Sequence, residues 1–210
     1  MAPMPESNGR MFEGEGFILA GGASRRMGED KAQLRFDGQM FVERVAGALA
    51  AIVQRISIVS ARHTDATWKW PRVADIYRDC GALGGLHAAL AHARAPWAAV
   101  VSCDLPFVTG ELFTRLAALH TEAFDVIIPV QMDGRLQPLC ALYDSRTCLE
   151  RARQLLRSGE LRLHVLLRQL RARRVFPDEL ADLTGASLFF TNVNTPEDYA
   201  LALAAHAAKR

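Results

Sequence analysis

The sequence has little that would mark a membrane, secreted or nucleic-acid-binding protein. No apolar run approaches the roughly 20 residues that cross a bilayer. Residues 1–16 contain no apolar core and do not resemble a secretory signal. The formal net charge of +2 is too small to indicate binding to DNA or RNA. We therefore expect a cytoplasmic protein that binds neither a membrane nor nucleic acid.

Cysteine is also sparse, and linker-like composition is absent. The four cysteines include no Cys-x-x-Cys pair, so we expect reduced structural thiols rather than disulfides or metal ligands. His87 and His92 are five residues apart and do not stack on one helical face, which argues against a zinc site built from histidine. With 210 residues, half of them hydrophobic, the chain predicts one domain over 16–210 after a loose extension over 1–15.

Apolar periodicity predicts strands and helices that mostly alternate. The predicted strands cover 17–20, 56–60, 72–74, 98–102, 126–129 and 139–143. The predicted helices cover 41–51, 84–92, 111–119, 145–157 and 196–207. This order predicts an α/β fold, a Rossmann-like doubly wound and mostly parallel sheet with helices on both faces, which binds ligands beyond the carboxyl ends of its strands.

The segment 19–31, directly after the first strand, is rich in glycine and positive charge. Gly21 and Gly22 have no side chain to block the backbone, so successive N–H groups can turn toward an anion. Arg26 and Lys31 supply compensating positive charge. On these residues alone, phosphate binding and an ordinary strand-to-helix connection with solvated arginines are about equally supported.

The commoner phosphate-binding motifs do not fit this segment. A Walker loop needs its lysine directly after the second glycine, whereas Glu29 and Asp30 intervene before Lys31. The Gly-Glu-Gly string over 14–16 precedes the strand instead of following it, which excludes a dinucleotide fingerprint.

The complete string over 19–31 resembles the signature loop of the molybdenum cofactor guanylyltransferases, within the wider nucleotidyltransferase group. Three further segments, 79–86, 98–106 and 190–198, resemble motifs of the same family in the same order. The resemblance extends over residues 17–199. Two positions depart from it, because Ala82 replaces the usual proline and Gln137, before Pro138, replaces a histidine.

The resemblance implies an enzyme that uses Mg²⁺ to transfer GMP from GTP to the molybdopterin cofactor and releases pyrophosphate. It implies catalytic roles for Arg26, Lys31 and Asp104, with Asp104 as the metal ligand. The residues implied in nucleotide binding are Leu19, Ala20, Gly21, Gly22, Lys31, Ser60, Asp75, Gly85 and Asp104. Those implied in molybdopterin binding are Gln137, Asn192 and Asn194.

Elementary chemistry is compatible with these roles. Asp104 follows an apolar run, so its carboxylate should emerge at the end of a strand, where one carboxylate suffices for Mg²⁺. By residue type alone a turn-capping aspartate is favoured, and the resemblance reverses that preference. Fixed cations such as Arg26 and Lys31 would neutralise charge on the triphosphate. A phosphomonoester, with a second pKa near ~6, needs positioning as a nucleophile rather than a general base.

Two features of the C-terminal part of the sequence can be explained either by structure or by function. Thr195 and Pro196 form a helix start, whereas strand alternation after 188–190 would place Asn192 and Asn194 on one face. Eight arginines over 151–174 fall on a predicted pair of amphipathic helical segments. They form either a solvated face or a surface for the anionic cofactor or an acidic protein partner.

Three functions stay open at this point. The first is the guanylyltransferase, for which Gly22 is the family's indicator of guanine. The second is a cytidylyltransferase for the same cofactor or a sugar-phosphate nucleotidyltransferase. The third is a GTP-binding regulator or cofactor-delivery protein, against which the joint presence of Lys31 and Asp104 argues. We expect a monomer whose partners are GTP, molybdopterin and proteins that make or accept the cofactor.

Overall fold

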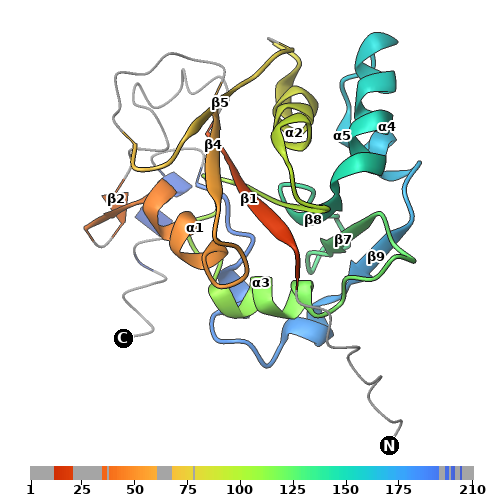
Figure 1. Cartoon of the computed structure of the whole chain (residues 1–210). Helices are drawn as coiled ribbons and strands as arrows, with labels where there is room; N and C mark the ends of the chain where they lie inside the picture. Colours follow the sequence, from red (N-terminus) through yellow and green to blue (C-terminus); the bar gives the residue numbers. More distant parts are fainter. Residues whose placement is uncertain are drawn as a thin grey trace, which may run out of the picture.

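The computed structural model describes residues 12–20, 35–36, 38–60, 68–77, 79–193, 197–198, 200–201 and 204. A seven-stranded sheet with the order β5-β4-β1-β6-β8-β7-β9 forms its centre (Figure 1). The strands are β1 Gly14–Leu19, β4 Ile56–Ser60, β5 Arg72–Ala74, β6 Trp97–Ser102, β7 Val126–Pro129, β8 Cys140–Asp144 and β9 Ala172–Val175. Neighbouring strands pair in parallel except at β8, which is antiparallel to β6 and β7. The predicted mostly parallel sheet is confirmed.

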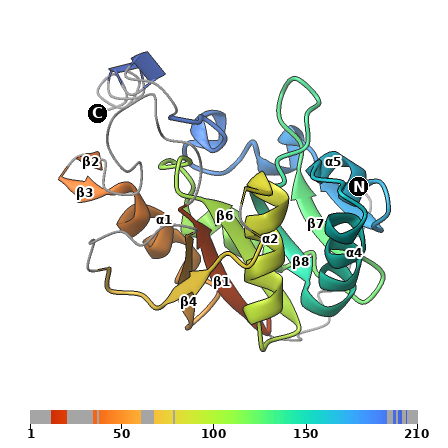
Figure 2. The same ribbon diagram turned by 90° about the horizontal axis from the view of Figure 1, so that it is seen from above.

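Helices cover both faces of the sheet. They are α1 Phe41–Leu49, α2 Gly81–His92, α3 Gly110–Ala117, α4 Ser145–Arg157 and α5 Leu163–Leu167, with 3₁₀ helices at Pro177–Leu180 and Ala186–Leu188. Helices α1 and α3 contribute to one hydrophobic core, and α2, α4 and α5 to the other. Figures 1 and 2 both show α2 and α4 side by side. None of the helices in the described ranges is long and apolar enough to cross a membrane.

The central strands are apolar on both sides because both sides are covered. All six residues of β6 are buried, as expected for a strand between two helical layers. Successive side chains point to opposite faces, so Ile18 and Val101 enter the core under α1 and α3, while Phe17 and Val100 enter the other. The helices α1 and α3 therefore belong to the layer opposite α2 and α4.

Polar side chains mark where two of the helices begin. Thr109 Oγ1 accepts a hydrogen bond from the N–H of Leu112 at the start of α3, over 3.3 Å. The Asp144 carboxylate accepts from the N–H of Thr147 at the start of α4, over 2.8 Å. Each satisfies a main-chain donor that the first helical turn leaves without a partner. A separate pair of short strands, β2 Arg35–Phe36 and β3 Gln39–Met40, precedes α1.

Three strands and one helix have the predicted bounds, namely β4, β5, β7 and α4. Helix α2 begins at Gly81 rather than at residue 84, after a bend in which Asp79 and Gly81 have φ of 62° and 58°. Two predictions are wrong. The region 151–174 is not wholly helical, because its end belongs to strand β9, and residues 186–190 form a 3₁₀ helix and a turn instead of a strand leading to Asn192. The helix predicted over 196–207 lies mostly outside the described residues.

Candidate active site

Five predicted positions, from the ends of four strands, meet at the carboxyl edge of the sheet. Leu19, the last residue of β1, is in register with Val59 of β4 and Ser102 of β6. Ser60 ends β4 in register with Ala74 of β5. Asp75 and Asp104 follow these strands in the chain, and Ala20 follows Leu19. The sheet therefore brings Leu19, Ala20, Ser60, Asp75 and Asp104 to one edge.

Asp104 lies in a turn whose main chain is bonded to β1. The N–H of Cys103 donates to the carbonyl oxygen of Leu19 over 3.1 Å, and the N–H of Leu105 donates to that of Ser102 over 3.3 Å. The Asp104 side chain is half-buried, and its Oδ1 atom is buried with no hydrogen-bond partner among the described residues. Because an unpaired buried carboxylate oxygen costs free energy, this atom is suited to a ligand that supplies positive charge.

Asp75 is held close to the first turn of α2. Its Oδ1 atom accepts a hydrogen bond from the N–H of Tyr77 over 3.0 Å. Burial raises the pKa of the Asp75 carboxyl above its usual range; the Tyr77 N–H lowers it, and the charge of Asp79 raises it further. A Cβ atom placed on Gly84 would lie 2.8 Å from the Tyr77 carbonyl oxygen and 3.3 Å from Asp75 Oδ2. The missing side chain of Gly84 therefore allows this close approach.

Gly85 packs against the end of β1. A Cβ atom placed on it would lie 3.5 Å from Cδ1 of Leu19, an ordinary van der Waals distance. Helix α2 thus lies directly over the strand from which the glycine-rich segment departs. Two predicted nucleotide-binding positions, Leu19 and Gly85, are brought together by this packing.

The antiparallel direction of β8 brings a fifth segment to the same edge. Cys140, the first residue of β8, is in register with Val101, and the N–H of Ser102 donates to the Leu139 carbonyl oxygen over 2.9 Å. Gln137 lies just before this contact and is only 7% exposed. Its side-chain Nε2 has no hydrogen-bond partner in the described part of the chain. Gln137 is therefore near the carboxyl end of β6 but largely covered.

The C-terminal segment also reaches the Asp104 turn. The N–H of Val193 donates to the carbonyl oxygen of Asp104 over 3.0 Å. Asn192, the preceding residue, is exposed. The predictions for Gly21, Gly22, Arg26, Lys31 and Asn194 lie outside the described residues.

Residues 16–175 match the family model of the MobA-like NTP transferase domain. The chain belongs to this family. It is 35% identical over 189 residues to a "Probable molybdenum cofactor guanylyltransferase" of Pelotomaculum thermopropionicum, covering 90% of this chain and 91% of the relative. It is 33% identical to a protein of the same name from Geobacillus sp. (strain WCH70), covering 88% and 95%. The resemblance noted in the sequence is confirmed.

Solved structures support the fold of this MobA-like transferase. A protein titled molybdopterin-guanine dinucleotide biosynthesis protein A, from Archaeoglobus fulgidus, has a TM-score of 0.78 and 23% identity, covering 92% of this chain and 99% of that one. The 2-C-methyl-D-erythritol 4-phosphate cytidylyltransferase of Thermus thermophilus has a TM-score of 0.64 and 17% identity, covering 91% and 98%. The predicted nucleotidyltransferase type of fold is confirmed.

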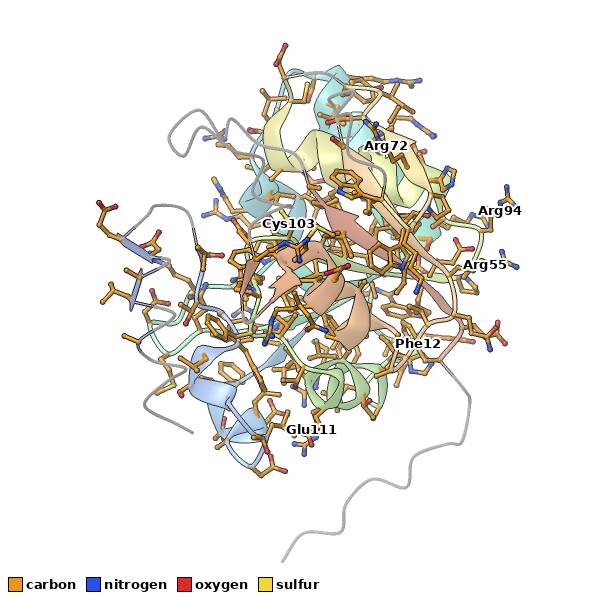
Figure 3. All side chains as sticks on the ribbon, turned by 90° about the vertical axis from the view of Figure 1, so that its left-hand side faces the viewer. Phe12, Arg55, Arg72, Arg94, Cys103 and Glu111 are labelled. Carbon is orange, nitrogen blue, oxygen red and sulfur yellow. The ribbon has the colours of Figure 1, made fainter. Side chains whose placement is uncertain are left out.

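The opposite edge of the MobA-like domain is held by a buried carboxylate. Glu15, 8% exposed, accepts hydrogen bonds from Nη1 of Arg55 over 3.2 Å and from the N–H of Arg94 over 2.8 Å. Figure 3 shows Arg55 and Arg94 near each other, with Cys103, the neighbour of Asp104, well away from them. These contacts are structural and lie outside the candidate site.

Half of the eight arginines over 151–174 are paired with carboxylates. Arg153, Arg162, Arg171 and Arg173 form ion pairs with Glu150, Glu160, Asp125 and Glu179. The last two pairs hold strand β9 and the turn before it. This part of the arginine-rich region is accounted for by the fold of the MobA-like transferase.

Sequence reasoning did not identify Tyr77, Gly84 or Val193 as parts of the site. It also did not identify Arg44, whose Nε donates a hydrogen bond to the Pro106 carbonyl oxygen in the Asp104 turn. Two adjacent glycines inside a helix carry an entropic cost, which is a sign of close packing that would have pointed to Gly84. Tyr77 and Val193 contact the site through their main-chain N–H groups, and Arg44 binds a main-chain carbonyl of the site. Such contacts do not depend on a recognisable residue type. Their contributions depend on which segments the fold brings together.

Proposed function

We propose that this protein transfers GMP from GTP to the molybdopterin cofactor, forming the guanine dinucleotide cofactor and pyrophosphate. The curated relatives that it matches along nine-tenths of its length carry the corresponding name. The observation that carries the proposal is the hydrogen bond from Cys103 to Leu19. This bond joins the start of the glycine-rich segment to the turn that presents Asp104, so a triphosphate on one would face the carboxylate of the other.

We assign Mg²⁺ to Asp104, in line with the divalent metal typical of the family. The residues fit this ion, because Asp104 offers a carboxylate oxygen that is buried and without a hydrogen-bond partner in the described chain. Mg²⁺ needs only one or two protein carboxylates when phosphates and water complete its octahedron. When bound, the ion would supply positive charge against the triphosphate.

The nucleotide is assigned to the edge formed by β1, β4 and β5. GTP would contact main-chain groups of Leu19, Ala20, Gly21 and Gly22. Its nucleoside would form hydrogen bonds with Ser60, which can donate and accept, and with the Asp75 carboxylate, which accepts. The half-buried Asp75 would gain most from an N–H or O–H donor, which stabilises its charged form. Gly85, which packs against Leu19, places the first turns of α2 beside this edge.

Positive charge and acceptor binding are assigned to the remaining predicted residues. Arg26 and Lys31 would stabilise the charge that develops on the α-phosphate and on the departing pyrophosphate. Gln137, Asn192 and Asn194 would hold the molybdopterin. Its phosphate is mostly dianionic at neutral pH and attacks without a general base, so these residues need only orient it.

The deciding experiment supplies the purified protein with Mg²⁺, molybdopterin cofactor and either GTP, CTP or ATP, and identifies the dinucleotide by mass. A product with GTP alone supports the proposal. A product with CTP would mean that the base is cytosine rather than guanine. Nucleotide binding without any product would mean that the protein binds the nucleotide but is not an enzyme. We place the reaction in the cytoplasm, which agrees with four cysteines that form no disulfide with one another.

A further inference from the structure

The turn that carries Asp104 is bound by two residues from distant parts of the chain. Nε of Arg44, on helix α1, donates a hydrogen bond to the carbonyl oxygen of Pro106 over 3.1 Å. The N–H of Val193, in the C-terminal segment, donates to the carbonyl oxygen of Asp104 itself over 3.0 Å. The two donors therefore fix main-chain carbonyls two residues apart in one turn, from two separate segments.

The same three segments share a small hydrophobic cluster. Phe41 of α1, Phe107 of the Asp104 turn and Val193 are 0%, 7% and 0% exposed, and Leu188 packs against them. This cluster is distinct from the two cores that lie under the helices. The Asp104 turn is consequently anchored by both packing and hydrogen bonds to the same two neighbours.

The Asp104 side chain shows the opposite pattern. Its Oδ1 atom is buried without a hydrogen-bond partner in the described residues, so no side-chain bond to that atom sets the carboxylate's position. The position of its Cα and Cβ atoms follows from the main chain, which Arg44, Val193 and the bond from Cys103 to Leu19 hold in place. A carboxylate on a main chain fixed in this way loses less conformational entropy when it binds a cation than one on a moving turn.

We infer that Arg44 and Val193 are positioning residues that set the metal affinity of Asp104. The inference rests on the proposed function, because it takes Asp104 as the ligand of the divalent cation. In this role both residues act on Asp104 through the main chain of its turn. Substitution of either residue lets the turn move. The carboxylate then has to become ordered when the cation binds, and this entropic cost weakens cation binding.

The test compares Arg44→Met and Val193→Ala with the unaltered protein. Mn²⁺ serves as the probe, and its binding in the presence of GTP is measured by electron paramagnetic resonance. The Mg²⁺ concentration for half-maximal turnover is measured in parallel. Loss of partners that orient a metal ligand typically costs 10–100-fold in affinity, so we expect Mn²⁺ binding to weaken on the order of tenfold.

Two matched variants separate positioning from loss of stability. Arg55→Met removes an arginine at the opposite edge of the sheet, and Val175→Ala removes the same atoms from a buried valine in strand β9. Both should leave Mn²⁺ affinity unchanged even where they lower the melting temperature. Arg44→Lys and Val193→Ile should keep much of the affinity, because one keeps a cationic donor and the other keeps the buried aliphatic packing that Val193→Ala loses.

A normal Mn²⁺ affinity in both Arg44→Met and Val193→Ala would overturn the inference, as would an equal loss in Val175→Ala. Asp104→Ala distinguishes this result from failure of the proposed function. If Asp104→Ala retains Mn²⁺ binding and turnover, the metal assignment itself is wrong. If Asp104→Ala loses both while the two positioning variants are normal, only the inference about Arg44 and Val193 fails.

Discussion

Gly84 lies directly against the carboxylate of Asp75. A methyl group on its Cα would be 3.3 Å from Asp75 Oδ2 and 2.8 Å from the carbonyl oxygen of Tyr77, closer than real Cβ atoms come to main-chain oxygens. Helix α2 and the segment after β5 can therefore meet only if residue 84 has no side chain. This contact determines where the Asp75 carboxylate stands at the carboxyl edge of the sheet.

Gly84→Ala should consequently displace Asp75 and weaken GTP binding. The added methyl overpacks a buried contact, for which we expect a loss of about 1–3 kcal/mol in the free energy of unfolding. Gly47→Ala is the control, because Gly47 lies in α1 with open space around it and should gain about 1 kcal/mol from helix propensity. Urea denaturation and GTP titration check both variants. Unchanged GTP affinity in Gly84→Ala would contradict the role given to Asp75.

Asp104→Ala should separate stability from activity. Removing the carboxylate should lower turnover on the order of 100-fold or more, since positive charge at the triphosphate is lost. It also removes a buried oxygen that has no partner in the described chain, so metal-free stability should stay equal or rise by up to about 1 kcal/mol. Melting curves without metal and single-turnover rates with Mg²⁺ test the two parts. A large loss of stability would mean that Asp104 has a structural role.

His87 should make stability depend on pH. It is 3% exposed, neither ring nitrogen has a hydrogen-bond partner in the described residues, and its ring meets that of Tyr77 edge-on at 4.8 Å. Burial lowers the pKa of His87, and the positive charge of Arg153 lowers it further. The unfolded chain therefore binds the proton more readily than the folded one.

It follows that the contribution of neutral His87 is complete above the unfolded pKa of about 6.5 and is lost as the pH falls from there through the folded-state pKa. His87→Phe keeps an aromatic ring beside Tyr77 and removes the titration. Its free energy of unfolding, measured in urea from pH 7.5 to 5, should change less with pH than that of the unaltered protein. Identical slopes would show that folding does not lower the pKa of His87.

Asp125 and Arg171 should respond unequally to substitution. Asp125 is 5% exposed and accepts bonds from the Arg171 main-chain N–H and guanidinium, with Nη2 at 2.6 Å from Oδ1, whereas the Arg171 side chain is 63% exposed. Arg171→Met leaves a buried carboxylate short of partners and should cost about 2–3 kcal/mol. Asp125→Asn leaves a solvated guanidinium and should cost about 1 kcal/mol. Equal losses in urea denaturation would contradict this asymmetry.

The same pair should also make stability depend on pH, this time through a carboxyl group rather than an imidazole. Hydrogen bonds from Arg171 hold the pKa of the Asp125 carboxyl below its usual range. Its contribution is therefore present above the unfolded pKa of about 3.9 and is lost as the pH falls through the folded-state pKa. In Arg171→Met the stability between pH 6 and 3 should decline less steeply than in the unaltered protein.

The sequence predicted those parts of the fold that local patterns determine. Strands β4, β5 and β7 are short apolar runs between turn signals, and their bounds were correct. Strand β9 was not found, because Arg173 and Arg174 interrupt its apolar pattern and the strand is defined by pairing with distant β7. Asn192 was placed on a strand that the chain does not form, since residues 186–190 close into a 3₁₀ helix and a turn.

The residues of the candidate site also fall into two groups, those that sequence motifs predicted and those that only the fold brings to the site. Asp75 and Asp104 were predicted through family motifs, because residue type alone favours a turn over a ligand for an aspartate after a strand. Arg44 and Val193 act on carbonyl groups of residues far along the chain, so neither spacing nor residue type identifies them. Gln137 was predicted through its motif, yet its burial follows from the direction of β8, which no local pattern sets.

The pairing of β1 with β6 also bears on how the protein is made. Gly14 is in register with Trp97, so the ribosome releases α1, β4, β5 and α2 before β6, the second partner strand of β1, is available. Long-range parallel strand pairs of this kind form slowly, and the apolar edge of a strand stays exposed until its partner strand pairs with it. Val193 reaches the Asp104 turn later still. A nascent chain thus acquires the finished carboxyl edge of its sheet only after residue 193 has left the ribosome.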